Sequence, residues 1–286
     1  MLQLKMKKIS LILALFLTLF LYVSGTYLSH PSQVNIANAP KELGKVRVVS
    51  IPSKSGATLS GWHLPAKQGK GGVLLLHGIH SNRLQMVNRA KFLHEEGYDV
   101  LLIDFQAHGE SNGSHITFGH LEALDAEAAY DYLEDRVCNP SIAVIGVSLG
   151  GASILLGRVK ERAKVLVLES VYPSIEDAIK NRLKIYFGTI GSFFSPLLTF
   201  QLQPRLGINT NDLRPIDEID QVKGSILIIT GSKDRHTTIK ESKKLFNKAP
   251  EPKELWIIEG AKHINFDSYK KEEYEERVLD FLEKWM

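Results

Sequence analysis

The sequence predicts an α/β fold in which helices cover both faces of a mostly parallel central sheet. Short apolar runs alternate along the chain with longer amphipathic stretches, which is the pattern of strand–helix–strand units. The runs are apolar at nearly every position, as expected of strands buried on both faces. With 286 residues and 44% apolar composition, the chain can bury one large core.

Six apolar runs are the expected parallel strands, and an earlier pair of segments predicts an antiparallel hairpin at the edge of the sheet. The hairpin segments, 46–51 and 58–64, flank a Lys-Ser-Gly turn. Functional residues of parallel sheets lie on the loops beyond the carboxyl ends of the strands, so the search for a site narrows to six loops. The six runs are residues 73–76, 100–103, 142–147, 165–168, 226–229 and 255–258.

The alternation stops after the run 165–168. Residues 171–223 contain no strand-like run and are rich in aromatic and leucine side chains, including Tyr186, Phe193 and Phe200. An interruption this long inside a compact domain is usually functional, and we expect a helical lid. Its apolar side chains are explained equally well by an acyl pocket and by packing of the lid on the core.

The N-terminal segment differs from the rest of the chain. Three lysines precede residues 9–28, which carry no charge and are long enough to span a bilayer. Residues 1–28 are therefore predicted to be a transmembrane signal anchor, or a signal peptide cleaved near 23–25. The remaining chain is expected on the extracytoplasmic side, membrane-anchored in the first case and secreted in the second. Residues 29–45 are expected to be a linker to one domain at 46–286.

Charge and cysteine content exclude several classes of function. The net charge of +3 resides in the three N-terminal lysines, so the rest of the chain has no basic excess for nucleic acid. The single cysteine, Cys138, allows no internal disulfide, and we expect it to be packed. His77 and His80 have no carboxylate or cysteine at a recognised ligand spacing, so neither a metal nor a cofactor is predicted. The oligomeric state is left open.

Gly146-Val147-Ser148-Leu149-Gly150 follows one expected strand directly and opens a helical stretch. A serine on so sharp a turn has a strained backbone, and glycine two positions to either side avoids collisions. The turn exposes the hydroxyl above the sheet, near helix N–H groups that favour developing negative charge. Ser148 is therefore the predicted nucleophile.

A serine hydroxyl needs a base, and the base needs a group that fixes its tautomer. Asp234 follows the strand 226–229, and His263 follows the strand 255–258. We expect His263 to be the general base and Asp234 to orient it. Glu169, just after the strand 165–168, is the alternative acid. His236 shares the loop of Asp234 and is expected at the surface.

These motifs, in the order serine, acid, histidine, resemble the α/β-hydrolase superfamily over residues 46–286, in its serine-aminopeptidase-like and dienelactone-hydrolase-like branches. The resemblance implies an oxyanion hole made by the backbone N–H groups of Ile79, after His77-Gly78, and Leu149. It extends to residues 104–111, where Ala107 replaces the first glycine of the family's loop.

The resemblance implies a serine hydrolase that cleaves a small carboxylic ester through an acyl-enzyme and without a cofactor. An apolar substrate is compatible with the aromatic and leucine side chains of the insertion. The same residues are compatible with a peptidase acting on short peptides, in which Glu169 or Glu176 holds the substrate amine, and with an acyltransferase. A catalytically silent binding module is the non-enzymatic alternative. An intact set of Ser148, Asp234 and His263 argues against it.

Overall fold

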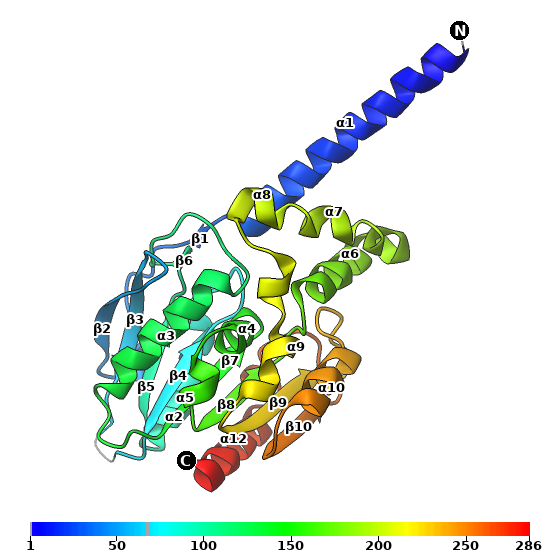
Figure 1. The fold of residues 1–286 in the computed structure, drawn as a ribbon. Coiled ribbons are helices and arrows are strands. Elements are labelled where there is room, and N and C mark those ends of the chain that lie inside the picture. The colour runs from blue at the N-terminus through cyan, green and yellow to red at the C-terminus, as the bar shows by residue number, and fades with distance from the viewer. Residues whose placement is uncertain (1, 67–68) are drawn as a thin grey trace.

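The computed structural model describes residues 2–66 and 69–286 and confirms the predicted α/β fold (Figure 1). Its main sheet has eight strands in the order β10-β9-β8-β7-β4-β5-β3-β2. The β2–β3 and β3–β5 pairs are antiparallel, as expected of an edge hairpin, and the other pairs are parallel. The strands are β2 (Arg47–Pro52), β3 (Thr58–Leu64), β4 (Gly72–Leu76), β5 (Asp99–Ile103), β7 (Ile142–Val147), β8 (Val165–Glu169), β9 (Ser225–Gly231) and β10 (Lys253–Ile258).

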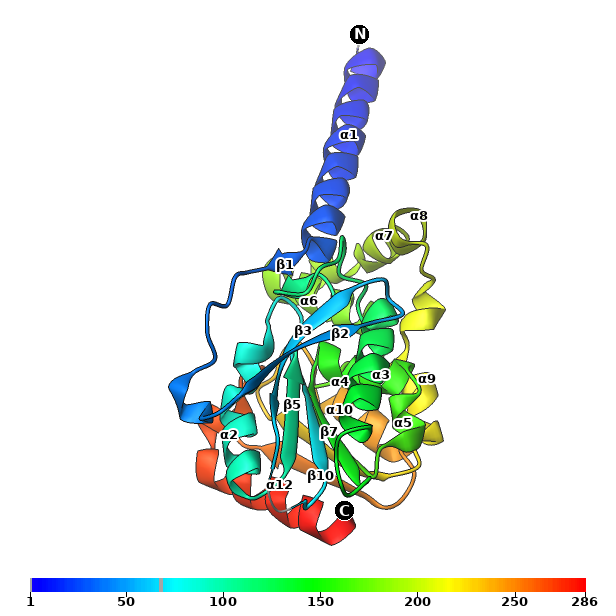
Figure 2. The same cartoon turned by 90° about the vertical axis from the view of Figure 1, so that its left-hand side faces the viewer.

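Helices cover both faces of this sheet because its central strands are apolar on both sides. In β4, Leu74 and Leu76 face one core, whereas Val73 and Leu75 face the other. Figure 2 shows the strands between these two helical layers. The first core includes residues of α3 (His120–Glu134), α4 (Leu149–Leu156), α5 (Val159–Arg162) and α10 (Ile239–Lys248), and the second includes residues of α2 (Val87–Glu95), α11 (Phe266–Tyr269) and α12 (Lys271–Trp285).

The insertion between β8 and β9 is helical, as predicted. Its first helix begins where the Ser174 hydroxyl accepts a hydrogen bond from the Asp177 N–H, and it kinks at Gly188, where φ is 66°. The kink allows the following short helices to fold back over α6. The insertion comprises α6 (Ile175–Ser192), α7 (Ser195–Thr199), α8 (Leu202–Leu206), α9 (Pro215–Glu218) and the 3-10 helices Thr210–Leu213 and Ile219–Gln221.

Helix α1 (Leu2–Ser29) projects from the domain, with its C-terminal end beside α8 (Figure 1). Within the described part of the chain, no helix has the length and apolar character needed to cross a bilayer. The predicted transmembrane signal anchor at 1–28, and the membrane localisation drawn from it, are therefore wrong. The last turns of α1 instead contact the domain: Arg205 of α8 donates hydrogen bonds to Thr26 Oγ1 and the Tyr22 carbonyl.

Residues 29–45 run along the loop that follows β5. The two-residue strand β1 (Ser32–Gln33) pairs in parallel with β6 (His108–Gly109). The Ser32 N–H donates to the carbonyl of Ala107, whose φ of 58° keeps the left-handed conformation that glycine adopts readily. A 3-10 helix, Lys41–Leu43, follows before β2.

Cys138 lies between α3 and β7, at the amino end of the parallel strands. Its side chain is exposed, so the expectation that it would be packed is wrong. The preceding helix α3 ends at Glu134, and the residues after it turn over the surface before β7 begins at Ile142.

Candidate active site

The turn between β7 and α4 has the strained geometry expected of a nucleophile elbow. Ser148 is buried and adopts φ 50° and ψ −103°. A Cβ atom on Gly150 would lie 2.3 Å from the Leu76 carbonyl oxygen, and one on Gly146 would lie 2.5 Å from the Gly151 nitrogen. Both contacts are too short for any side chain, so the two glycines permit the turn.

His263 and Asp234 are joined by a hydrogen bond from the imidazole Nδ1 to the carboxylate Oδ2, 2.7 Å long. The other carboxylate oxygen accepts the N–H groups of His236 and Thr237, at 2.8 and 2.9 Å. Ser170 Oγ donates to Oδ2 at 2.9 Å. Burial alone would raise the pKa of Asp234, but the hydrogen bond and charge of His263 and the Thr237 N–H hold it below its usual value.

The predicted nucleophile and base lie on loops beyond the carboxyl ends of the parallel strands β7 and β10, which are separated in the sheet by β8 and β9. In the described residues no hydrogen bond joins Ser148 Oγ to His263. Residues at the end of β8 connect the two halves of the site. The Ser148 N–H donates to the Glu169 carbonyl at 2.8 Å, and the next residue, Ser170, bonds Asp234. Sequence reasoning missed Ser170, although its position directly after a strand was available as a signal.

Glu169, the alternative acid, is directed away from the imidazole and into a buried charge cluster. Its carboxylate accepts two hydrogen bonds from Arg89, at 2.9 and 2.6 Å, and one from the Tyr274 hydroxyl at 2.6 Å. Asp267 contacts the same guanidinium at 2.8 Å. With both oxygens engaged by Arg89, this carboxylate is not available to orient His263.

Ile79 and Leu149 line one cavity, whereas Ser148, Asp234 and His263 are not among its lining residues. Among the described residues, neither the Ile79 nor the Leu149 backbone N–H group donates a hydrogen bond, so both remain able to bind a ligand oxygen. Gln85 fixes the loop that precedes Ile79. The Gly78 N–H donates to Gln85 Oε1, and Gln85 Nε2 donates to Asn265, two residues after the predicted base. Gln85 was not identified from the sequence, because an isolated glutamine carries no motif.

His77 and His108 hold the same loop by hydrogen bonds. His77 Nδ1 donates to the Gly78 carbonyl, and its Nε2 accepts from the Phe105 N–H. His108 Nε2 accepts from the His80 N–H at 3.2 Å. Burial lowers the pKa of both imidazoles, so both are neutral at pH 7. No three His, Cys, Asp or Glu side chains form a metal-binding group within residues 2–66 and 69–286.

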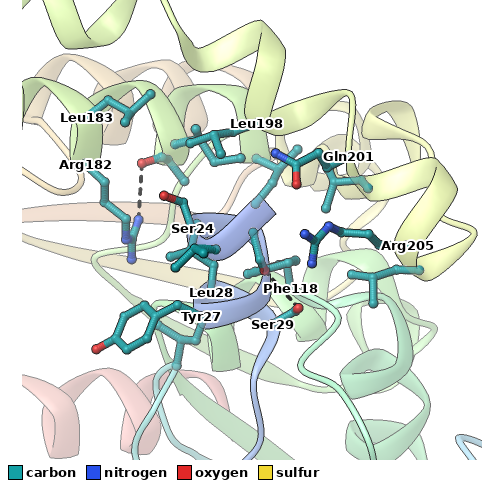
Figure 3. A pocket seen from close by; sticks show the side chains of 18 of the residues that line it. Ser24, Tyr27, Leu28, Ser29, Phe118, Arg182, Leu183, Leu198, Gln201 and Arg205 are labelled. Atoms are coloured by element: carbon teal, nitrogen blue, oxygen red, sulfur yellow. Dashed lines mark hydrogen bonds between the residues drawn. The ribbon is translucent and has the colours of Figure 1, made fainter. Parts of the chain in front are cut away.

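The cavity has a volume of about 630 Å³ and is lined mainly by apolar side chains (Figure 3). Residues of the insertion and of α1 both line it. Five insertion side chains that line the cavity also form a small core of their own, so they both hold the lid together and face the cavity. These five are Ile175, Ile179, Leu183, Leu198 and Leu202, and the apolar contribution of α1 comes from Phe20, Val23 and Leu28.

Two further residues of the site were not identified from the sequence. The ring of His236 lies 5.1 Å from the ring of His263, centroid to centroid, and is partly buried rather than at the open surface. Its pKa is lowered, mainly by burial. Arg182 of α6 lines the cavity. In the sequence, this arginine belongs to no recognisable motif.

Comparison with known proteins places the chain in a family. Residues 67–212 match the model of the serine aminopeptidase S33 family. The uncharacterized protein YqkD of Bacillus subtilis is 23% identical over 82% of this chain and 78% of its own. The lysophosphatidylserine lipase ABHD12 of Danio rerio is 27% identical over 64% of this chain and 48% of its own.

Solved structures agree with this assignment. The esterase Pf2001 of Pyrococcus furiosus superposes with a TM-score of 0.74 and 27% identity, covering 91% of this chain and 98% of that one. The α/β hydrolase GrgF of a Penicillium species, at 20% identity and a TM-score of 0.67 over 85% of this chain and 99% of its own, shows the same fold. The chain therefore belongs to the serine aminopeptidase S33 family of α/β hydrolases, and it is a hydrolase.

Proposed function

We propose that the protein hydrolyses small carboxylic esters, with Ser148 as nucleophile, His263 as general base and Asp234 as the residue that orients the base. The observation that carries this proposal is the 2.7 Å hydrogen bond from His263 Nδ1 to the carboxylate of Asp234. Three further donors hold this carboxylate in place. With Nδ1 engaged as a donor, the other ring nitrogen, Nε2, is left free to accept a proton.

The proposed reaction proceeds through an acyl-enzyme. Ser148 Oγ attacks the acyl carbon while His263 Nε2 takes its proton, and the N–H groups of Ile79 and Leu149 bind the resulting oxyanion. The imidazolium returns the proton to the departing alcohol. Water, deprotonated by the same imidazole, then attacks the acyl carbon; the bond to Ser148 Oγ breaks, the imidazolium returns its proton to Oγ, and the acid is released. Catalytic hydrogen bonds are often long before substrate binds, so a bond between Ser148 and His263 is expected to form in the substrate complex.

The cavity supports an ester substrate with an apolar acyl or alcohol portion, because apolar side chains dominate the wall beside Ile79 and Leu149. The structural relative Pf2001 is an esterase, which agrees with this substrate class. We further propose that residues 46–286 form the hydrolase domain, with 171–223 as its lid.

A peptidase that acts on short peptides has less support. Glu169 is engaged by Arg89 and Tyr274, and Glu176 lies 3.6 Å from Arg214, so both carboxylates already have cationic or hydroxyl neighbours. Acyl transfer to an added alcohol would use the same acyl-enzyme. Its extent would depend on whether the alcohol or water attacks the acyl carbon first.

Labelling with a fluorophosphonate probe tests the proposal, because the probe reacts covalently with an activated serine. We expect the wild-type chain to be labelled and Ser148→Ala to remain unlabelled. Ser192→Ala is the matched control, since Ser192 is a partly exposed serine of the lid and does not line the cavity; it should label like the wild type. Absence of labelling in the wild-type chain would favour a silent binding module instead.

A further inference from the structure

Arg182 is a partly buried cation that lines an apolar cavity, and burial lowers its pKa against the opposing charges of Tyr172, Tyr186 and Asp234. Its side chain extends from α6 along the cavity wall, and its hydrogen bond runs back to the Ala178 carbonyl of the same helix at 3.3 Å (Figure 3). In the described part of the chain, no ion pair includes Arg182, and no Asp or Glu lines the cavity. The guanidinium therefore has most of its five N–H donors available.

The other arginine of the cavity, Arg205, shows what a satisfied guanidinium looks like here. Its Nη1 donates to Thr26 Oγ1 at 2.8 Å, and its Nη2 donates to the Tyr22 carbonyl at 2.6 Å. Its ring contact with Tyr22 adds a cation–π interaction at 4.6 Å. Arg205 thus holds α1 against α8. The hydrogen bond of Arg182, by contrast, stays within its own helix and joins no two elements.

Arg182 also lies close to the reaction centre. The adjacent Asn181 donates hydrogen bonds to the His236 carbonyl and to Glu241, which ties this turn of α6 to the loop of Asp234. Burial is the main cause of the lowered pKa of His80 and of His236, and the charge of Arg182 is a smaller contribution to both shifts. Arg182 lines the same cavity as Ile79 and Leu149, so a group bound to Arg182 would share that cavity with the proposed oxyanion hole.

We propose that Arg182 binds an anionic oxygen group of the substrate, a carboxylate or a phosphate, so that the preferred substrates are acyl esters that carry a negative charge beside an apolar chain. A partly buried guanidinium that forms no ion pair leaves N–H donors unsatisfied, and an anion supplies it with charge-assisted, bidentate hydrogen bonds. The apolar wall accommodates the chain. As a statement about substrates this rests on the proposed ester hydrolysis, but the binding of the anion does not require catalysis.

Calorimetric titration of the full-length Ser148→Ala chain tests the binding directly. Octyl phosphate, octanoate and octanol share one chain length and differ in the head group. We expect at least one anion to bind about 10-fold or more tightly than octanol, since a hydrogen bond to a charged group contributes about 1.5–3 kcal/mol. The tighter of the two anions identifies the head group. Equal affinity for all three compounds would overturn the proposal.

Variants assign the effect to Arg182. In the Ser148→Ala background, Arg182→Gln should lose the preference for the anions, and Arg182→Lys should keep part of it through its charge. Lys184→Gln removes one positive charge from an exposed position of the same helix, outside the cavity, and should retain the full preference. A preference that survives in Arg182→Gln, or that is lost equally in Lys184→Gln, would contradict the proposal.

Turnover by the otherwise wild-type chain separates this inference from the proposed function. Matched p-nitrophenyl esters of a neutral acid and of a dicarboxylic acid should differ in kcat/KM by about 10-fold or more in favour of the anionic ester. If neutral esters are cleaved without that preference, the inference fails and the ester hydrolase stands. If neither ester is cleaved but the anions bind through Arg182, the proposed function fails and the anion site stands.

Discussion

Asparagine at position 234 would test the role of the acid without changing the shape of the side chain. Asp234 Oδ1 accepts two backbone N–H groups, so the amide oxygen of Asn would remain there and its NH₂ would face His263. The imidazole would then have to accept at Nδ1, and its proton would move to Nε2. That is the nitrogen that has to take the proton of Ser148, so the base would be present in the wrong tautomer.

The expected consequence of Asp234→Asn is a fall in kcat of about 10⁴, or roughly 5 kcal/mol of transition-state stabilisation, with a much smaller effect on KM. The assay is hydrolysis of p-nitrophenyl butyrate under saturating and limiting substrate. Unfolding in urea, followed in parallel, shows whether the variant is folded.

Glu169→Gln is the matched comparison, because it removes one charge from a carboxylate that bonds Arg89 instead of the imidazole. Loss of a partner from a buried ion pair costs about 3–5 kcal/mol of stability, so the variant should unfold at lower urea concentration. The folded fraction should keep kcat within about tenfold of the wild type, since the hydrogen bond between Asp234 and His263 is untouched. A greater loss of kcat in Glu169→Gln than in Asp234→Asn would refute the assignment of the acid.

Three other predictions concern the elbow, the core and the cavity wall. Gly150→Ala should destabilise the fold by about 1–3 kcal/mol and abolish turnover, because its methyl group would lie 2.3 Å from the Leu76 carbonyl oxygen; thermal unfolding measures the first effect. Burial raises the pKa of Asp125 to about 6, above its value of about 3.9 in the unfolded chain, so its contribution to stability is greatest below pH 4 and is lost as pH rises through 6. Between pH 4.5 and 7.5 the unfolding free energy of the wild type should therefore fall by about 2 kcal/mol more than that of Asp125→Asn, and equal slopes would contradict this. Deletion of residues 2–28 should lower kcat/KM for an octanoate ester about tenfold or more, because apolar side chains of α1 line the cavity. The kcat/KM for an acetate ester should fall much less. Equal losses for both esters would show that α1 does not contact the acyl chain.

The arrangement of the strands was predictable because each has a local cause. Every expected strand is present within one or two residues, since runs such as 142–147 are apolar on both faces and can be buried only inside a sheet covered by helices. The elbow was also predictable, because a glycine two residues to either side of Ser148 reflects a steric requirement of that turn. The catalytic roles of Ser148, Asp234 and His263 remain predictions.

The supporting residues were not predictable, because their roles depend on contacts between distant parts of the chain. Ser170 acquires its role only when β8 and β9 are neighbours, and Gln85 only when its side chain reaches Asn265. The apolarity of residues 9–28 predicts a membrane segment. Composition alone does not show that the end of α1 packs against α8. Arg182 likewise gains meaning only from the cavity around it.

Cys138 offers a practical consequence of the fold. The chain has one cysteine, and it is exposed at the end of the sheet opposite to the loops that carry Ser148 and His263. A maleimide-linked dye or support would therefore react at one defined point, without entering the cavity. Molecules tethered in this way would share one orientation, with the loops that carry Ser148 and His263 directed away from the support.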